Sequence, residues 1–156
     1  MEGWETWHRQ GPDGAIESEQ RVALVRPVVE FSEAGAERLG RSYWREVRGL
    51  TGSLVRPREH RGALELRLLG GPVLLRFDQP MIEASETRAF CSYPIAGGLL
   101  TRRAGGELSF EQTAGTLSST VRGFFPRAAN YDRLQGRAHV AISRRFFRRL
   151  IAEAAR

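Results

Sequence analysis

The last part of the chain, residues 128–155, carries the pattern that most constrains the fold. When its residues are placed at about 100° per step around a helix axis, the pattern predicts an amphipathic helix. Phe146, Phe147 and Leu150 lie on its apolar side, and Arg144 and Arg148 lie on its basic side. A helix of this length gains most of its stability by packing its apolar side on another element. The rest of the chain must therefore supply a broad apolar surface.

Three polar residues, Gln135, His139 and Ser143, lie within the apolar side at four-residue intervals. Burying an imidazole costs free energy unless the ring finds a hydrogen-bond partner. We therefore expect a polar group opposite His139. Ser143 is explained most simply as a small residue that allows the helix to approach its neighbour closely.

Length and composition indicate one domain, residues 1–156, in which residues 1–15 form either an N-terminal extension or an extra strand. The chain has 156 residues, 41% of them hydrophobic, which suffices for a sizeable core. No run approaches the roughly 20 apolar residues of a membrane span, and the first ten residues do not resemble a signal peptide. Together with a single cysteine, these features predict a cytoplasmic protein.

The segments before residue 128 alternate between strand and helix patterns. Residues 16–26 alternate as a strand does, and Ser32 can cap a helix whose apolar residues recur up to Val47. From Gly49 to Pro126, short alternating segments are separated by turn sequences, which predicts sequential antiparallel hairpins. The expected order is a strand, a helix, about six strands and a long closing helix.

This order resembles the START-related helix-grip superfamily, which includes polyketide-cyclase-like and pollen-allergen-like ligand-binding proteins. The resemblance covers residues 16–150 and rests on topology. It implies an α+β fold in which a curved antiparallel sheet of about seven strands wraps around the C-terminal helix. It also implies an apolar ligand between sheet and helix, touched by the helix's inner face. A lipocalin-like barrel with an added helix is the alternative fold.

Candidate binding residues follow from this arrangement. His139 can donate and accept a hydrogen bond at once, and Gln135 and Tyr131 lie one and two turns before it. Tyr93 precedes a proline at a sheet edge, where it either points into a cavity mouth or packs against a turn. The expected apolar wall consists of Trp44, Leu66, Leu68, Phe110, Phe125 and Phe146.

Other chemistry finds little support in the sequence. Cys91 and His139 are a weak nucleophile–base pair, because nothing near Cys91 lowers the pKa of its thiol. His8, His60 and His139 lie in different elements without metal-ligand spacing, and the paired glycines precede strands, not a phosphate-binding helix. We therefore predict no metal and no cofactor.

Three functional classes remain. The first is the binding of a small, mostly apolar organic molecule, and the second is a cyclase- or hydrolase-type enzyme with His139 as general base. The third is a structural or nucleic-acid-binding module, suggested by a net charge of +6 and by the Arg102-Arg103 and Arg144–Arg149 clusters. No aromatic platform or recognition helix accompanies these arginines, so nucleic acid is the less expected partner. The sequence also leaves a homodimer open.

Overall fold

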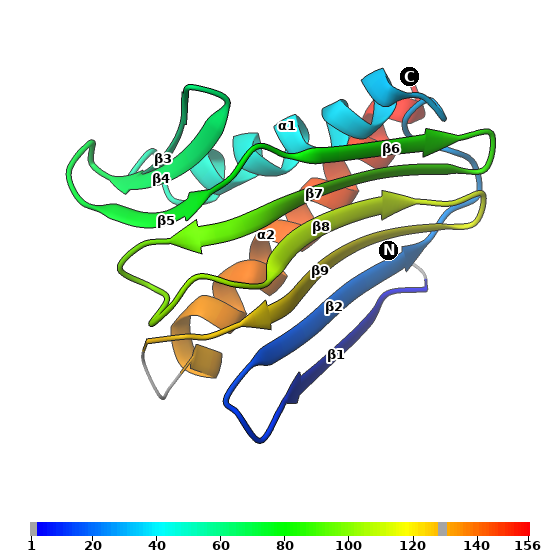
Figure 1. Ribbon diagram of the computed structural model, residues 1–156. Helices are drawn as coiled ribbons and strands as arrows, with labels where there is room; N and C mark the ends of the chain where they lie inside the picture. Colours follow the sequence, from blue (N-terminus) through cyan, green and yellow to red (C-terminus); the bar gives the residue numbers. More distant parts are fainter. Residues whose placement is uncertain (1–2, 128–130) are drawn as a thin grey trace.

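The computed structural model describes residues 3–127 and 131–156, and the side chains of residues 3–127 and 135–156. The elements follow in the order β1 (Glu5–Gln10), β2 (Ile16–Ala23), α1 (Glu33–Leu50), β3 (Val55–His60), β4 (Ala63–Leu68), β5 (Val73–Phe77), β6 (Met81–Ser85), β7 (Arg88–Gly97), β8 (Glu107–Gln112), β9 (Thr116–Phe124) and α2 (Tyr131–Ala154) (Figure 1). The predicted C-terminal helix is confirmed from Tyr131 onward, whereas residues 128–130 lie outside the described part.

All nine strands belong to one antiparallel sheet, in the order β1-β2-β9-β8-β7-β5-β4-β3, with β6 also paired to β7. The end strands β1 and β3 do not pair with each other, so the sheet is open. The α+β prediction is therefore confirmed, and the alternative of a closed lipocalin-like barrel is wrong. The sheet plus a C-terminal helix is compatible with helix-grip topology.

The strand number exceeds the predicted seven. One reason is β1, which shows that the N-terminal segment forms an extra strand. Another is the turn at Asp78–Pro80, which separates β5 from the short strand β6. Both strands pair with β7: β5 pairs near Ile95, and β6 pairs with residues from Ser92 back to Arg88.

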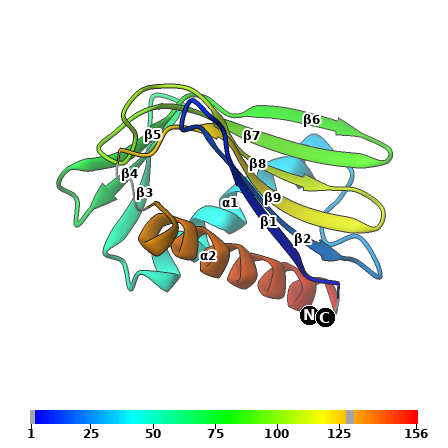
Figure 2. The same cartoon turned by 90° about the horizontal axis from the view of Figure 1, so that it is seen from below.

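Both helices lie on the same face of the curved sheet (Figure 2). The sequence predicted a sheet that wraps around the C-terminal helix, and the structure shows that α1 shares the covering of this face. Helix α1 is 18 residues long, begins after the predicted cap and buries Leu39, Tyr43 and Val47. The hydroxyl of Ser32 accepts a hydrogen bond from the N–H of Gly35 at 3.1 Å, which satisfies a donor that the first turn would otherwise leave unpaired. Neither helix has the length and hydropathy of a membrane span within the described residues.

The apolar side of α2 faces the sheet as predicted. Phe146, Phe147 and Leu150 are fully buried, and Arg144 and Arg148 are exposed. Ser143 is also fully buried, and its hydroxyl donates to that of Ser119 at 3.2 Å. A small side chain at this position brings the helix close to β9.

Two bulges change which side chains face the helices. On β9, Val121 lies opposite Ser18 and Phe124 lies opposite Ile16, so β9 contains one more residue than β2 in this interval. Gly123, at φ 64°, takes the left-handed conformation that such a bulge needs and that only glycine adopts without cost. Phe124 therefore points inward, and the alternation stops before Phe125.

The second bulge lies on β5. Leu66 is opposite Leu75, and the next residue of β4, Arg67, is opposite Val73. Leu74 is thus the extra residue. Because the bulge breaks the alternation, neighbouring Leu74 and Leu75 both face the space between the sheet and the helices.

Candidate functional site

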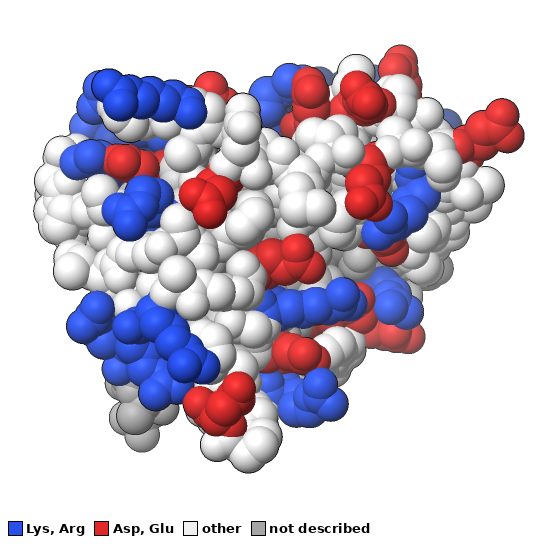
Figure 3. Space-filling view, in the orientation of Figure 1, with Lys and Arg blue, Asp and Glu red and all other residues white. Residues whose placement is uncertain are grey.

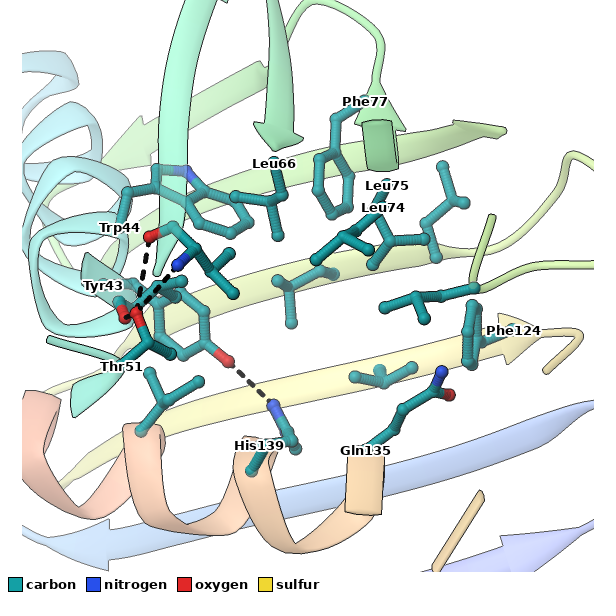
Figure 4. A pocket seen from close by; sticks show the side chains of 18 residues that line it. Tyr43, Trp44, Thr51, Leu66, Leu74, Leu75, Phe77, Phe124, Gln135 and His139 are labelled. Atoms are coloured by element: carbon teal, nitrogen blue, oxygen red, sulfur yellow. Dashed lines mark hydrogen bonds between the residues drawn. The ribbon is translucent and has the colours of Figure 1, made fainter. Parts of the chain in front are cut away.

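A pocket of about 180 Å³ lies between the sheet, the second half of α1 and the first half of α2 (Figure 4). Its lining is overwhelmingly apolar, and among the described residues that line it none has a side chain that is charged at neutral pH. Among the apolar residues that form its wall are Trp44, Val47, Val55, Leu66, Leu74, Leu75, Phe77, Leu108, Val121, Phe124 and Ile142. Gln135 and His139 project into this lining from consecutive turns of α2.

His139 has the polar partner that the sequence led us to expect. The Nδ1 atom lies 2.9 Å from the hydroxyl oxygen of Tyr43, a buried residue of α1. The ring is 7% exposed, and burial lowers the pKa of His139 from 6.5 to about 4. The imidazole is therefore neutral near pH 7, with one ring nitrogen carrying a proton.

The proton can be assigned from the chemistry of the pair. A phenol is a better hydrogen-bond donor than a neutral imidazole N–H, so Tyr43 donates to Nδ1. The remaining nitrogen, Nε2, then carries the hydrogen of His139 and is a donor. In general, the hydrogen bond at one ring nitrogen of a histidine determines whether the other nitrogen carries the proton.

Three described residues of the pocket lining have a buried polar atom without a hydrogen bond. These atoms are Trp44 Nε1 on α1 and Gln135 Oε1 and His139 Nε2 on α2, and none of them has a partner among the described residues. Unpaired buried polar atoms are rare and costly, at about 1–3 kcal/mol each. On α2, His139 Nε2 is a donor and Gln135 Oε1 is an acceptor, and these two atoms belong to residues one helical turn apart.

Besides Tyr43, Thr51 has a hydroxyl among the described lining residues, and this hydroxyl forms hydrogen bonds within the protein. It donates to the carbonyl of Val47 at 2.9 Å and accepts from the N–H of Val55 at 3.1 Å (Figure 4). This hydroxyl ties the end of α1 to the start of β3. The unpaired polar atoms of the described lining therefore belong to Gln135, His139 and Trp44.

The structure brings together some of the predicted site residues. His139, Gln135 and Trp44 line the pocket. Phe110 and Tyr93 lie behind the pocket wall, in the core: the Phe110 ring is 4.5 Å from that of Tyr43, and the Tyr93 ring is 5.2 Å from that of Trp44. The side chain of Tyr131 lies outside the described part of the chain.

The predicted apolar wall was partly wrong. Leu66 lines the pocket, but Phe146 is a core residue, Leu68 is 39% exposed and Phe125 does not line the pocket. Sequence reasoning missed Phe124 and Leu74, because it extended strict alternation through the two bulges. The available signal for the two bulges was a glycine near each of them: Gly123 for Phe124 and Gly98 for Leu74. At Gly98 the backbones approach closely, since a Cβ there would lie 2.4 Å from the carbonyl oxygen of Leu74.

Sequence reasoning also missed Tyr43 as the partner of His139, because its position in the apolar stripe of α1 indicated only a core residue. Cys91 is fully buried on β7, and burial raises the pKa of its thiol to about 11. The thiol is therefore protonated and unreactive near neutral pH. Within the described residues, His, Cys, Asp and Glu side chains form no cluster of three or more that could hold a metal ion.

The arginine clusters are largely occupied by contacts within the molecule. Arg145 and Arg149 form ion pairs with Glu46 at 3.1 and 3.3 Å. Arg102 and Arg103 lie over the ring of Phe125, at 5.5 and 3.7 Å from its centroid. Arg127 is close to the same loop, since its guanidinium donates to the carbonyl of Leu99 at 2.9 Å. Basic side chains also gather at the lower left of Figure 3.

Comparison with models of known protein families and with curated protein sequences gives no match. The geometry of the pocket and the chemistry of its lining therefore carry the functional argument.

Proposed function

We propose that the protein binds a small, uncharged and mostly apolar organic molecule in the pocket between the sheet, α1 and α2. The observation that carries this proposal is the pair of buried, unpaired polar atoms, Gln135 Oε1 and His139 Nε2, that α2 places one turn apart in a mostly apolar lining. A ligand that accepts from one and donates to the other would satisfy both.

The size of the pocket limits the ligand. A cavity of about 150 Å³ lined by apolar side chains accommodates a benzene molecule. A pocket of about 180 Å³ therefore suits one ring with one or two short substituents. Typical drug-sized sites are larger, at about 300–1,000 Å³.

The lining also determines the ligand's charge and polarity. Moving an ionised group into an apolar site without a counter-charge costs several kcal/mol. Because the described residues of the lining carry no charge at neutral pH, they offer a carboxylate or ammonium ligand no counter-charge that would offset this cost. A carbonyl facing the His139 N–H and an N–H or O–H facing the Gln135 carbonyl fit the two unpaired atoms.

The arrangement of helices and sheet supports membership of the helix-grip ligand-binding proteins, in which an apolar ligand lies between these elements. The fold by itself hosts many functions, so this resemblance supports the location of the site and not the identity of the ligand.

Catalysis with His139 as general base has less support. A general base works best when its pKa is near the working pH, whereas burial lowers the pKa of His139 to about 4. Among the described lining residues no carboxylate orients the ring, and its partner is the Tyr43 hydroxyl. Binding is therefore the favoured function.

Titration with acetophenone, an uncharged ring with one carbonyl, tests the location of the site. We expect saturable binding that is lost in Leu74→Trp, because the larger side chain fills the pocket. Leu68→Trp, at an exposed position of neighbouring β4, is the matched control and should leave the affinity unchanged. Binding that survives Leu74→Trp in a folded protein, or no binding by the wild type, would refute the proposal.

Substituting His139 separates binding from catalysis. If His139 only binds, His139→Gln should weaken acetophenone about 2- to 13-fold, the equivalent of one neutral hydrogen bond of about 0.5–1.5 kcal/mol. The hydrolysis of p-nitrophenyl acetate, a small uncharged ester, should be equally slow with both proteins. A rate that falls about 100-fold in His139→Gln would identify a general base instead.

A further inference from the structure

Strand β1 is an edge of the sheet that has no covering. All six of its residues, Glu5–Gln10, are exposed, so neither face is buried. It pairs only with β2, and the backbone groups of its outer edge have no strand partner in the described part of the chain. Such an edge is a template for another strand.

The opposite edge strand, β3, is protected against pairing. It contains Pro57, which lacks a backbone N–H, between the exposed residues Arg56 and Arg58. Proline and repeated charge of one sign are common ways to prevent edge association. In contrast, β1 has no proline and keeps a regular register with β2 from Glu5 to Gln10.

The charges of β1 are arranged in a pattern that complements itself. The register with β2 places Glu5 opposite Arg21, Trp7 opposite Glu19 and Arg9 opposite Glu17. The Arg9 guanidinium lies 2.7 Å from the Glu17 carboxylate, and the Trp7 indole N–H donates to Glu19 at 2.9 Å. Both signs of charge alternate over this edge of the sheet in Figure 3.

We propose that β1 pairs with β1 of a second copy, antiparallel and about a two-fold axis at Trp7. In this register, Glu5 of each copy lies opposite Arg9 of the other, and the two Trp7 side chains are direct cross-strand neighbours. Opposite charges and aromatic pairs in such positions stabilise a sheet. Such a dimer brings four strands side by side: β2 and β1 of one copy, then β1 and β2 of the other. Across them the charges alternate in sign, from Arg21 and Glu5 of the first copy to Arg9 and Glu17 of the second.

Other registers lack this complementarity. An axis between Trp7 and His8 places Glu5 opposite Gln10 and Thr6 opposite Arg9. An axis at His8 places Trp7 opposite Arg9 and Thr6 opposite Gln10. The Trp7 register is thus the one among these that pairs each charge of β1 with its opposite, and closed two-fold dimers are the commonest oligomers.

The test is the mass of the full chain in solution, measured by sedimentation equilibrium up to millimolar concentration. The wild type should form a dimer. Glu5→Arg and Arg9→Glu should each weaken it at least 10-fold, because each variant places like charges opposite each other across the axis. Arg56→Glu on β3 makes the same change of charge at the other edge and should leave the dimer intact.

Mixing the two variants gives the sharpest result. In a heterodimer, the new arginine of Glu5→Arg lies opposite the new glutamate of Arg9→Glu. The second pair consists of the unchanged Arg9 of the first variant and the unchanged Glu5 of the second, so both pairs join opposite charges. The mixture should therefore form dimers although each variant alone does not. A wild type that stays monomeric at all concentrations, or a dimer that neither variant weakens, would overturn the proposal. So would a β1 edge that pairs only with an added extended peptide.

Discussion

His139 combines a structural contact with an unused hydrogen-bonding atom. Its Nδ1 accepts from Tyr43, and its Nε2 is buried at the pocket without a partner among the described residues. The first contact fixes the orientation of the ring, and the second atom is the one free to meet a ligand.

Burial of His139 predicts a specific dependence of stability on pH. Above pH 6.5 the imidazole is neutral in both the folded and the unfolded chain, so protonation of His139 does not lower the free energy of unfolding. Between 6.5 and about 4, only the unfolded chain takes up the proton, so the free energy of unfolding falls as the pH falls. The total loss is roughly 3 kcal/mol.

Urea unfolding at a series of pH values measures this loss. His139→Gln should remove the dependence in this window, whereas His60→Gln, at an exposed position of β3, should retain it. Equal slopes in the wild type and in His139→Gln would show that the buried imidazole is not responsible.

Tyr43→Phe tests the hydrogen bond that orients His139. The change leaves Nδ1 buried without its partner, so the free energy of unfolding should fall by about 1–3 kcal/mol. The ¹⁵N shifts of the imidazole should show the Nε2–H tautomer in the wild type and a loss of that preference in the variant. A wild type with the proton on Nδ1 would contradict the assignment.

At the residue scale, the sequence predicted that His139 would be buried and would need a polar partner. It could not identify that partner, because Tyr43 is about 100 residues away in the chain, in the apolar stripe of another helix. Periodicity determines the side of a helix that a residue occupies, but not which elements will meet there.

Among the elements, α1 and α2 are joined by a network of charges. Glu46 of α1, whose side chain is 3% exposed, meets Arg145 and Arg149 of α2. Near the end of α2, Glu153 pairs with Arg38 of α1 at 2.8 Å. Burial raises the pKa of Glu153, but hydrogen bonds from Arg38 and Arg149 and nearby positive charges outweigh this and lower it overall. These pairs set the position of α2 beside α1, and with it the position of His139 beside Tyr43.

Glu46→Gln should therefore lower the free energy of unfolding by about 1–3 kcal/mol, as expected for the loss of hydrogen bonds to a charged group. Glu37→Gln is the matched control on the same helix: its pair with Arg41, at 4.0 Å, is exposed and should contribute less than about 0.5 kcal/mol. Thermal or urea unfolding measures both changes. Equal losses in the two variants would mean that burial does not strengthen the Glu46 pairs.

Elements were predicted better than the directions of their side chains. The cap at Ser32, the antiparallel strands and the long final helix follow from local patterns. The wall residues Phe124 and Leu74 depend on bulges, each of which adds one residue to a strand and reverses the alternation beyond it. A glycine such as Gly123 marks a place where this can happen, but the pairing of two strands decides whether it does.

At the scale of the whole molecule, different parts of the curved sheet pack differently against the helices. Next to the second half of α2 it packs a core around Phe146 and Phe147, and next to the first half it leaves the pocket. The convex face and the β1 edge remain for contacts with solvent and with a second copy. Cytoplasmic location and the identity of the ligand stay predictions.

The central claim is that the pocket takes an uncharged ligand with a donor and an acceptor. Benzamide and benzoate have nearly the same shape and the same number of non-hydrogen atoms, but only benzoate is charged near pH 7. Calorimetric titration of both should show benzamide binding at least about 100-fold more tightly, because a carboxylate would meet no counter-charge from the lining residues that the structure describes. Benzoate binding as tightly as benzamide, or more tightly, would contradict the account.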